Sequence, residues 1–238
     1  MSNSQAQGYE VVRTLEAAFY TSESIYQKER NTLFTRTWQY AGHLSWVANP
    51  GDYFSFEIAG QGLFCIRDNK NVLHTFYNVC QHRAHQIVEG QGEGKKTLVC
   101  PYHAWSYHLD GHLLRGPNTE VVPAEVREKI CLTPVRTQEF CGFIFVNLDD
   151  DADPMENWYP GVEAELRDFV PQIDRLAPVE TIRADEKCNW KVSVENYSEC
   201  YHCRLNHRTF STGVVKPDTY DIQPQGYCLR HTTECQNL

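Results

Sequence analysis

Cys80-Gln81-His82 and, after 17 further residues, Cys100-Pro101-Tyr102-His103 place one cysteine and one histidine in each of two short segments. Thiolate sulfur and neutral imidazole nitrogen are ligands for zinc and for iron–sulfur centres. Zinc sites commonly pair like with like, as C-x2-C with H-x3–5-H, whereas each segment here mixes the two ligand types. The mixed pairs fit a [2Fe–2S] cluster in which one iron takes both cysteines and the other takes both histidines. The four side chains therefore predict a metal centre, with a zinc site and buried structural residues as the alternatives.

The residues on either side of the two segments follow a β-strand pattern. Residues 72–77 run directly into Cys80, and the apolar run at residues 97–99 leads into Cys100. Asp110-Gly111 is a typical hairpin turn, because both residue types tolerate the backbone angles that it needs. Residues 38–148 are therefore predicted to form a small antiparallel β domain that carries both metal-binding loops. Its expected strands are residues 53–58, 63–66, 72–77, 97–99, 104–109, 113–114, 135–139 and 143–146, and the Gly-rich residues 90–94 are expected to form a loop.

A helical pattern precedes this domain. Residues 19–38 predict a helix that Thr21 or Ser22 can cap, and Glu23 favours its positive N-terminal end. Residues 1–37 are accordingly predicted to form a helical segment that packs on the C-terminal domain. The residues expected on the buried face of the helix are Tyr26, Leu33 and Phe34.

A second domain is predicted after a polar linker at residues 149–154. Pro160 can open a helix, a strand is expected at residues 179–183, and a further helix is expected at residues 190–206. The predicted fold class is α+β: a β domain at residues 38–148 is followed by the first part of an α+β domain at residues 149–238.

Composition excludes two classes of function. The formal net charge of −9 argues against nucleic-acid binding, which needs clustered Lys and Arg. No apolar run approaches the roughly 20 residues that a membrane span needs, and residues 1–8 lack a signal-peptide pattern. We therefore expect a cytoplasmic protein without membrane or nucleic-acid partners, in which the ten cysteines are thiols and metal ligands and not disulfides.

The pattern C-x-H-x17-C-P-Y-H-x-W, from Cys80 to Trp105, resembles the cluster motif of Rieske [2Fe–2S] domains at all four ligand positions. The flanking Pro101 and the aromatic residues also agree. The resemblance implies that Cys80 and Cys100 hold one iron of the cluster while His82 and His103 hold the other. His85 is close in sequence, but its spacing predicts a loop or core histidine.

A second constellation lies near the C-terminal end, where Glu199, His202 and His207 follow one another closely. On a helix, Glu199 and His202 would share a face, because residues three apart are neighbours. His207 would lie well round an ideal helix, so the helix must end, bulge or loosen for both imidazoles to reach one metal. Two histidines and a carboxylate are typical of non-haem Fe(II) oxygenases. The alternatives are a buried Glu–His hydrogen bond with a surface histidine, and a di-iron bundle, which also uses E-x-x-H.

Together the two motifs resemble the catalytic α-subunit of the Rieske non-haem iron oxygenases, from about residue 19 to the C-terminal end. The resemblance implies that His202 and His207 bind a mononuclear Fe(II). It implies that Glu199 bridges His202 to His103 of the partner subunit in a homotrimer and relays electrons. The run from Glu195 to Cys203, with Glu where ring dioxygenases usually have Asp, is similar to the branch that acts on quaternary ammonium compounds such as glycine betaine, stachydrine, carnitine and choline.

One position of the family pattern is missing from the chain. The family's third iron ligand is an Asp, which we expect beyond residue 238, so the chain is interpreted as part of a longer protein. Nothing in the motif nominates the carboxylates that are present near the C-terminal end, which are Asp218, Asp221 and Glu234.

The leading hypothesis from the resemblance is an oxygenase that hydroxylates or N-demethylates a small quaternary amine. Electrons would come from NAD(P)H through a flavin/iron–sulfur reductase, and O2 would be the co-substrate. An aromatic ring-hydroxylating dioxygenase would use the same metal ligands, whereas a Rieske ferredoxin would need only the β domain. Tyr197 and Tyr201 could surround a cation, but packing in the core is the expected role for both.

Overall fold

The computed structural model describes residues 13–236. The chain divides into two compact units, one of residues 29–184 and 223–230, the other of residues 185–222, 231–236 and the described part of residues 1–28. The predicted domain limits of 1–37, 38–148 and 149–238 stay predictions, and their first 12 residues lie outside the described part. The predicted α+β fold class is confirmed.

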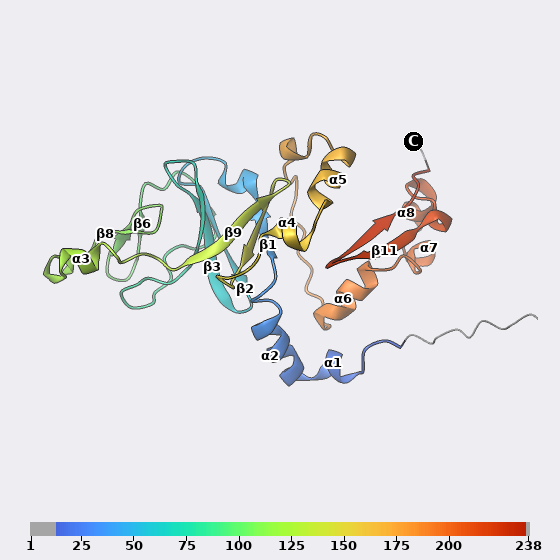
Figure 1. Ribbon diagram of the computed structural model, residues 1–238, viewed down its shortest axis with the longest axis horizontal. Helices are drawn as coiled ribbons and strands as arrows, with labels where there is room; N and C mark the ends of the chain where they lie inside the picture. The colour runs from blue at the N-terminus through green and yellow to red at the C-terminus, as the bar shows by residue number, and fades with distance from the viewer. Residues whose placement is uncertain (1–12, 237–238) are drawn as a thin grey trace, which may run out of the picture. The chain divides into compact units, whose positions relative to one another are not determined.

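The first unit contains an antiparallel sheet of seven strands in the order β1-β10-β9-β4-β3-β2-β5. Strand β3 lies inside this sheet, and all five of its residues from Leu63 to Arg67 are buried, as expected for a strand covered on both faces. The strands β1, β2, β3 and β9 can be followed in Figure 1. The bounds are β1 Gln39–His43, β2 Tyr53–Ile58, β3 Gln61–Arg67, β4 Leu73–Tyr77, β5 Gln91–Gly92, β9 Pro134–Phe140 and β10 Phe143–Asn147.

Two tight turns set the register of this sheet. Ala59-Gly60 joins β2 to β3 and Cys141-Gly142 joins β9 to β10, so that Ile58 pairs with Gln61 and Phe140 pairs with Phe143. All four turn residues have positive φ, between 50° and 84°. Two positive φ angles in a two-residue loop match the right-handed twist of the strands.

A smaller sheet carries one of the metal-binding loops. It consists of β6 (Leu98–Val99), β7 (Ser106–Tyr107) and β8 (Leu113–Arg115), which are all antiparallel. The predicted Asp110-Gly111 turn lies between β7 and β8, and Gly111 has a φ of 90°. A Cβ atom on Gly111 would lie 2.6 Å from the ring of Phe76, so only glycine fits here. The short helices η2 (Thr119–Val121) and α3 (Ala124–Arg127) follow β8.

The main core of the first unit lies between the two sheets. Phe64 and Phe76 of the large sheet contact each other with ring centroids 5.6 Å apart, and Leu98 and Tyr107 of the small sheet belong to the same buried cluster. The cluster also contains the sulfur-bearing residues Cys80 and Cys100. The remaining buried members are Ile66, Ile87, Val88, Leu109 and Leu132.

The N-terminal helix is shorter than predicted. In place of one helix at residues 19–38, the chain forms α1 (Ala18–Thr21) and α2 (Glu23–Thr32), and β1 starts at Gln39. Ser22 interrupts the helix, and its hydroxyl accepts a long hydrogen bond of 3.5 Å from the Ile25 amide. Helix α2 has no buried residue, so the expected buried face through Tyr26, Leu33 and Phe34 is wrong.

Several other predicted elements differ from the observed ones. The strand expected at residues 179–183 is absent, and Val179 and Ile182 are exposed. Because β propensity reflects packing against neighbouring strands, a segment rich in β-branched residues stays irregular when no strand pairs with it. The strands β1 and β5 were not predicted, and β5 lies within the expected loop at residues 90–94. The helix expected after Pro160 is confirmed as α5 (Val162–Phe169), next to the unpredicted α4 (Met155–Trp158).

The second unit is built from short elements. They are α6 (Trp190–Tyr197), α7 (Cys203–Asn206), α8 (Arg208–Gly213) and η4 (Pro217–Thr219), followed by a hairpin of β11 (Asp221–Gln225) and β12 (Cys228–Thr232). The Asn189 side chain caps α6 by accepting a hydrogen bond of 3.1 Å from the Lys191 amide. Within residues 13–236, no helix has the length and apolar character for crossing a membrane.

Candidate functional site

The two predicted metal-binding loops have the same backbone geometry. The first follows β4, the second joins β6 to β7, and each begins at a cysteine. In both loops the cysteine carbonyl accepts a hydrogen bond from an alanine amide four residues later, Ala84 in one and Ala104 in the other. Both alanines have positive φ, 55° and 57°. Non-glycine residues in this conformation are uncommon and concentrate at functional sites, so the repeated strain marks the loops as a pair.

The loops bring the four predicted cluster ligands together in two layers. The side chains of Cys80 and Cys100 lie inside the core, each residue only 2% exposed, and both thiols are free. The imidazoles of His82 and His103 lie nearer the surface, with ring centroids 4.8 Å apart. Two inner sulfurs and two outer imidazoles are the donor arrangement of a cluster in which one iron takes thiolates and the other takes imidazoles.

The donor count agrees with a two-iron cluster. Among the described residues, no three His, Cys, Asp or Glu side chains are grouped so that they could hold one metal ion. A structural zinc ion needs four protein ligands around a single centre. A [2Fe–2S] cluster needs only two protein ligands on each iron, because the sulfides supply the rest. Cys80 and Cys100 supply two ligands for one iron, and His82 and His103 supply two for the other, so the donor set fits such a cluster.

Aromatic side chains hold the outer imidazoles in place. The ring of Trp105 stacks on His82 with centroids 4.8 Å apart and an interplanar angle of 11°. The ring of Tyr102 lies 3.8 Å from that of His103. Burial, together with the nearby His82, Arg83 and His85, lowers the pKa of His103 and favours the neutral imidazole that ligates metals. His85 lies in the loop as predicted, and its Nδ1 is 2.6 Å from the Gln86 carbonyl.

Tyr107 is a site residue that the motif did not reveal. Its side chain is fully buried, and its hydroxyl lies 3.1 Å from the Cys80 sulfur while accepting a hydrogen bond from the Gln81 amide. Burial, reinforced by Cys80, raises the pKa of Tyr107, so that its proton remains available to donate to the sulfur. The available signal was its position two residues after Trp105, within the segment expected to form a strand at residues 104–109.

The second constellation does not lie on one helix. Helix α6 ends at Tyr197, so Glu199 and His202 occupy the turn that leads into α7, which corrects the helix predicted at residues 190–206. His207 lies at the break between α7 and α8, with φ of −118° and ψ of 56°. The expected interruption between the two imidazoles is therefore present, and their ring centroids are 5.2 Å apart.

Glu199 orients one of these imidazoles. Its carboxylate lies 2.6 Å from Nδ1 of His202, and its other oxygen accepts a hydrogen bond from the Tyr201 amide. The hydrogen bond from His202 lowers the pKa of Glu199. Because Nδ1 of His202 is occupied by the carboxylate, Nε2 is the nitrogen with a free lone pair for a metal.

A disulfide joins Cys200 to Cys203 beside the same imidazole. The Cα atoms of the two cysteines are 5.1 Å apart, inside the range that a disulfide spans. The expectation that the cysteines are thiols and metal ligands is wrong for this pair, because the turn after α6 brings the two side chains together. The other eight cysteines are free.

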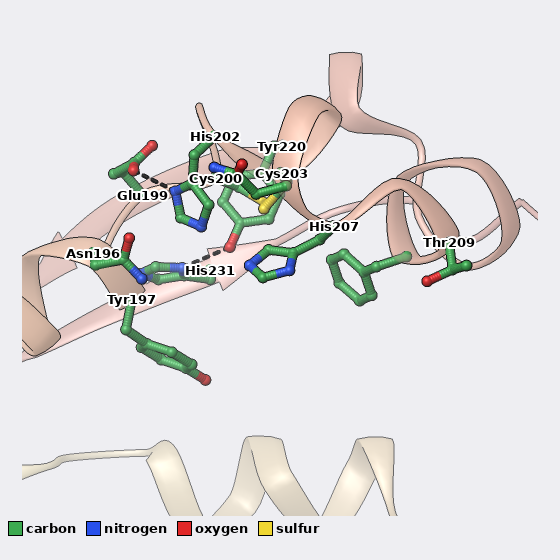
Figure 2. A pocket seen from close by; sticks show the side chains of 12 residues that line it. Asn196, Tyr197, Glu199, Cys200, His202, Cys203, His207, Thr209, Tyr220 and His231 are labelled. Atoms are coloured by element: carbon green, nitrogen blue, oxygen red, sulfur yellow. Dashed lines mark hydrogen bonds and ion pairs between the residues drawn. A yellow bond between two sulfur atoms is a disulfide. The ribbon is translucent and has the colours of Figure 1, made fainter. Parts of the chain in front are cut away.

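A cavity of about 530 Å³ lies beside His202 and His207. Figure 2 shows the two imidazoles and the hydroxyl of Tyr220 directed toward a common space. Tyr220 and His231 also line the cavity. Tyr220 lies directly before β11 and His231 lies in β12, and no sequence motif marks either residue. The remaining lining residues are Asn196, Tyr197, Glu199, Cys200, Cys203, Asn206, Thr209 and Phe210.

None of the carboxylates left open by the motif lines this cavity. Asp218 pairs with Arg204, and Glu234 lies 2.8 Å from the amino group of Lys216. Asp221 is the first residue of β11. Core packing, the role expected for Tyr197 and Tyr201, is wrong, since their exposed fractions are 81% and 95%.

The chain resembles known proteins along most of its length. Residues 37–126 match the family model of the Rieske [2Fe-2S] domain, and residues 173–235 match that of the ring hydroxylating alpha subunit (catalytic domain). The carnitine monooxygenase oxygenase subunit of Escherichia coli (strain K12) is 39% identical over 201 residues, which are 84% of this chain and 54% of that protein. The chain thus spans about half the length of this curated relative.

Two solved structures show the same fold. The first is a quaternary ammonium Rieske monooxygenase, whose structure gives insights into carnitine oxidation and inter-subunit electron transfer. It superposes on this chain with a TM-score of 0.83 at 34% identity, over 88% of this chain and 57% of the other. Naphthalene 1,2-dioxygenase superposes with a TM-score of 0.67 at 27% identity, over 81% of this chain and 45% of the other. The monooxygenase is the more similar of the two in sequence and structure.

Proposed function

Because this chain belongs to the Rieske non-haem iron oxygenases, we propose that the protein containing it oxidises a small quaternary ammonium compound of the betaine type. The observation that carries this function is the presence, in one chain, of a two-cysteine, two-histidine loop pair and a cavity with Glu199, His202 and His207. A Rieske ferredoxin would need only the first of these, so the second favours an oxygenase.

The loop pair is the proposed [2Fe–2S] site. Cys80 and Cys100 would hold one iron, and His82 and His103 would hold the other. When bound, the cluster supplies single electrons at a potential that imidazole ligation keeps well above that of an all-cysteine ferredoxin. The core around the two sulfurs would exclude water from that side of the cluster. The imidazoles nearer the surface would provide the route by which electrons leave it.

His202 and His207 are the proposed ligands of a mononuclear Fe(II). Two imidazoles leave positions for a carboxylate, which we expect from outside residues 13–236, and for O2. The bound iron would supply O2 activation. Glu199 fixes the Nδ1 proton of His202 and thereby presents Nε2 to the metal.

Glu199 is also the proposed bridging acid for electron transfer. Its position against His202 suits a carboxylate that links this imidazole to His103 of the partner subunit in a homotrimer. Inter-subunit electron transfer in the similar quaternary ammonium monooxygenase supports this assignment. A flavin/iron–sulfur reductase that uses NAD(P)H is the proposed electron source.

The cavity suits a cationic substrate. It contains the aromatic rings of Tyr197, Phe210 and Tyr220 and the carboxylate of Glu199, and no Lys or Arg among residues 13–236 lines it. Aromatic faces attract ammonium groups, and a quaternary ammonium offers no N–H that would need an acceptor. Hydroxylation would replace a C–H bond by a C–OH bond on a carbon bonded to that nitrogen. The product would then lose its hydroxyl proton and expel the tertiary amine, which breaks the C–N bond and releases formaldehyde if the carbon is an N-methyl group.

A reconstituted reaction tests this function. The protein that contains this chain is mixed with a reductase, NADH and either glycine betaine or L-carnitine, and O2 uptake, formaldehyde and released amine are measured. We expect substrate-dependent O2 uptake with cleavage of a C–N bond. A protein that makes cis-diols from arenes and cleaves no betaine would instead be an aromatic ring-hydroxylating dioxygenase.

A further inference from the structure

Tyr220 and His231 form a hydrogen-bonded pair in the cavity that also contains His202 and His207 (Figure 2). Tyr220 lies directly before β11, and His231 lies in β12, so the hairpin brings them together. The hydroxyl of Tyr220 is 2.9 Å from Nδ1 of His231, and the two rings meet edge to face with centroids 5.7 Å apart.

We assign the hydroxyl as the donor in this hydrogen bond. Burial, followed by the nearby Tyr197 and Glu199, raises the pKa of Tyr220, so the phenol keeps its proton. Within residues 13–236, Nδ1 of His231 is the only acceptor that this hydroxyl reaches. A neutral imidazole that accepts at Nδ1 carries its own proton on Nε2. Tyr220 therefore selects the tautomer in which His231 has an N–H donor at Nε2.

That donor has no protein partner. Nε2 of His231 makes no hydrogen bond to any residue between 13 and 236, although the imidazole is half-buried. The ring is confined between Tyr220 and Tyr197, whose centroid lies 6.0 Å away at an interplanar angle of 26°. An oriented donor that is partly withdrawn from water and left unpaired costs free energy, which a ligand acceptor can recover.

The cavity otherwise has little to offer an anionic group. Within the described part of the chain, no Lys or Arg lines it and Glu199 is the one carboxylate there, which repels anions. A betaine carries a carboxylate only a few bonds from its ammonium group, so both ends enter a cavity of about 530 Å³. The aromatic rings can receive the ammonium group, whereas the carboxylate needs a donor such as Nε2 of His231.

We propose that His231, held by Tyr220, donates a hydrogen bond from Nε2 to the substrate carboxylate and so selects betaines over quaternary amines without an acid group. This inference rests on the proposed function and names the substrate class more narrowly. His231 and Tyr220 are positioning and specificity residues in it, and neither ligates the metal.

Binding of two matched ligands to the protein that contains this chain tests the inference. Glycine betaine and tetramethylammonium share the quaternary nitrogen, but only the first has a carboxylate. Dissociation constants are measured by titration calorimetry for the wild type, His231→Phe and Tyr220→Phe. His231→Phe keeps an aromatic ring and removes the donor, so we expect glycine betaine to bind about tenfold or more weakly and tetramethylammonium to be unchanged.

Tyr220→Phe gives an independent check if His231→Phe is poorly folded. It leaves the imidazole of His231 in place but no longer fixes its proton on Nε2, so the affinity for glycine betaine should fall by a smaller factor. Tyr227→Phe is the control, because Tyr227 lies in the turn of the same hairpin and does not line the cavity. It should bind both ligands as the wild type does.

Each other outcome has a definite meaning. A variant set that loses both ligands equally, or loses neither, overturns the assignment of His231 and leaves the proposed function standing. A wild-type protein that binds neither ligand contradicts the proposed function itself, and the assignment falls with it.

Discussion

The two candidate metal sites are built in opposite ways. The sulfurs of Cys80 and Cys100 belong to a buried cluster that two sheets share, and an aromatic ring packs against each imidazole. His202 and His207 lie at breaks between helices of four to eight residues, and the aromatic side chains around them are mostly exposed. The first site is therefore formed by long-range packing, whereas the second depends on local turns.

This difference predicts how each site responds to change. A site whose ligands come from a packed core keeps its geometry when one surrounding contact is lost, because many neighbours hold each side chain. A site on short turns depends on a few local links, such as the Glu199–His202 hydrogen bond and the Cys200–Cys203 disulfide. The following predictions challenge or refine this contrast.

Loss of a cluster ligand should have the largest effect. Cys100→Ser removes one of two buried sulfur donors, so we expect complete loss of the cluster's visible absorbance and of its iron. Cys188→Ser is the control, because Cys188 is an exposed free thiol in the other unit and should leave both unchanged. Retention of the full absorbance by Cys100→Ser would mean that the sulfur does not ligate the cluster.

Removal of the disulfide should affect stability next most strongly. Closing a loop of four residues contributes about 2 kcal/mol in the chain-entropy model, and the short helices near it offer little other restraint. The Cys200→Ser, Cys203→Ser double variant should lower the free energy of unfolding by up to this amount in urea denaturation. The cluster absorbance should be unchanged. If dithiothreitol lowers the free energy of unfolding of the wild type by the same amount, the effect comes from the disulfide bond.

Asp68 and Glu199 each form a hydrogen bond with a histidine, but their contributions to stability should depend differently on pH. Burial alone would raise the pKa of Asp68, but hydrogen bonds from His74 and from the amides of Val72 and Lys70 outweigh it and lower the pKa. The folded pKa thus lies below the unfolded value of about 3.9. The stabilisation is then fully present above about pH 4 and is lost as the pH falls through the folded pKa.

We therefore expect Asp68→Asn to lower the free energy of unfolding by about 1–2 kcal/mol at pH 7, with a gap that narrows below pH 4. Glu199→Gln is the matched variant in the more exposed site, where solvent screens the pair, and it should lower stability much less than Asp68→Asn does. Chemical denaturation across this pH range measures both. A gap for Asp68→Asn that stays constant down to pH 2 would contradict the sign of the shift.

The smallest expected effect is electronic. Tyr107→Phe removes the hydrogen bond to the Cys80 sulfur, which favours the more negative reduced cluster. A net loss of about 1 kcal/mol corresponds to about 40 mV, so the reduction potential should fall by roughly this amount. Tyr102→Phe, which changes an exposed tyrosine beside His103, should leave the potential in place. Equal potentials for the wild type and Tyr107→Phe would remove this role from Tyr107.

The sequence predicted the first region well because its signals are local. Strand alternation, the Asp110-Gly111 turn and the spacing of the four ligands each involve a few adjacent residues, and the structure contains them at the expected places. Strand β1 was missed because it is an edge strand with mixed residues, identified only by pairing with β10. Tyr107 was missed because its role depends on a contact with a loop 27 residues away.

The second region was harder to predict. The helical pattern at residues 190–206 is real up to Tyr197, but the turn that follows is stabilised by the Glu199–His202 contact and a disulfide, which propensity does not encode. The hairpin places Tyr220 and His231 beside the cavity, and no sequence motif predicts this position. The strand expected at residues 179–183 failed because no partner strand pairs with it in the described part of the chain.

The most direct test of the two-site account is the iron and acid-labile sulfide content of the purified chain, measured beside a His202→Ala, His207→Ala double variant. In the double variant we expect about two irons and about two sulfides per chain, as a [2Fe–2S] cluster on the loop pair requires. The wild type should contain the same sulfide, and any additional iron in it should depend on His202 and His207. Zinc without acid-labile sulfide, or a sulfide content that falls in the double variant, would contradict the account.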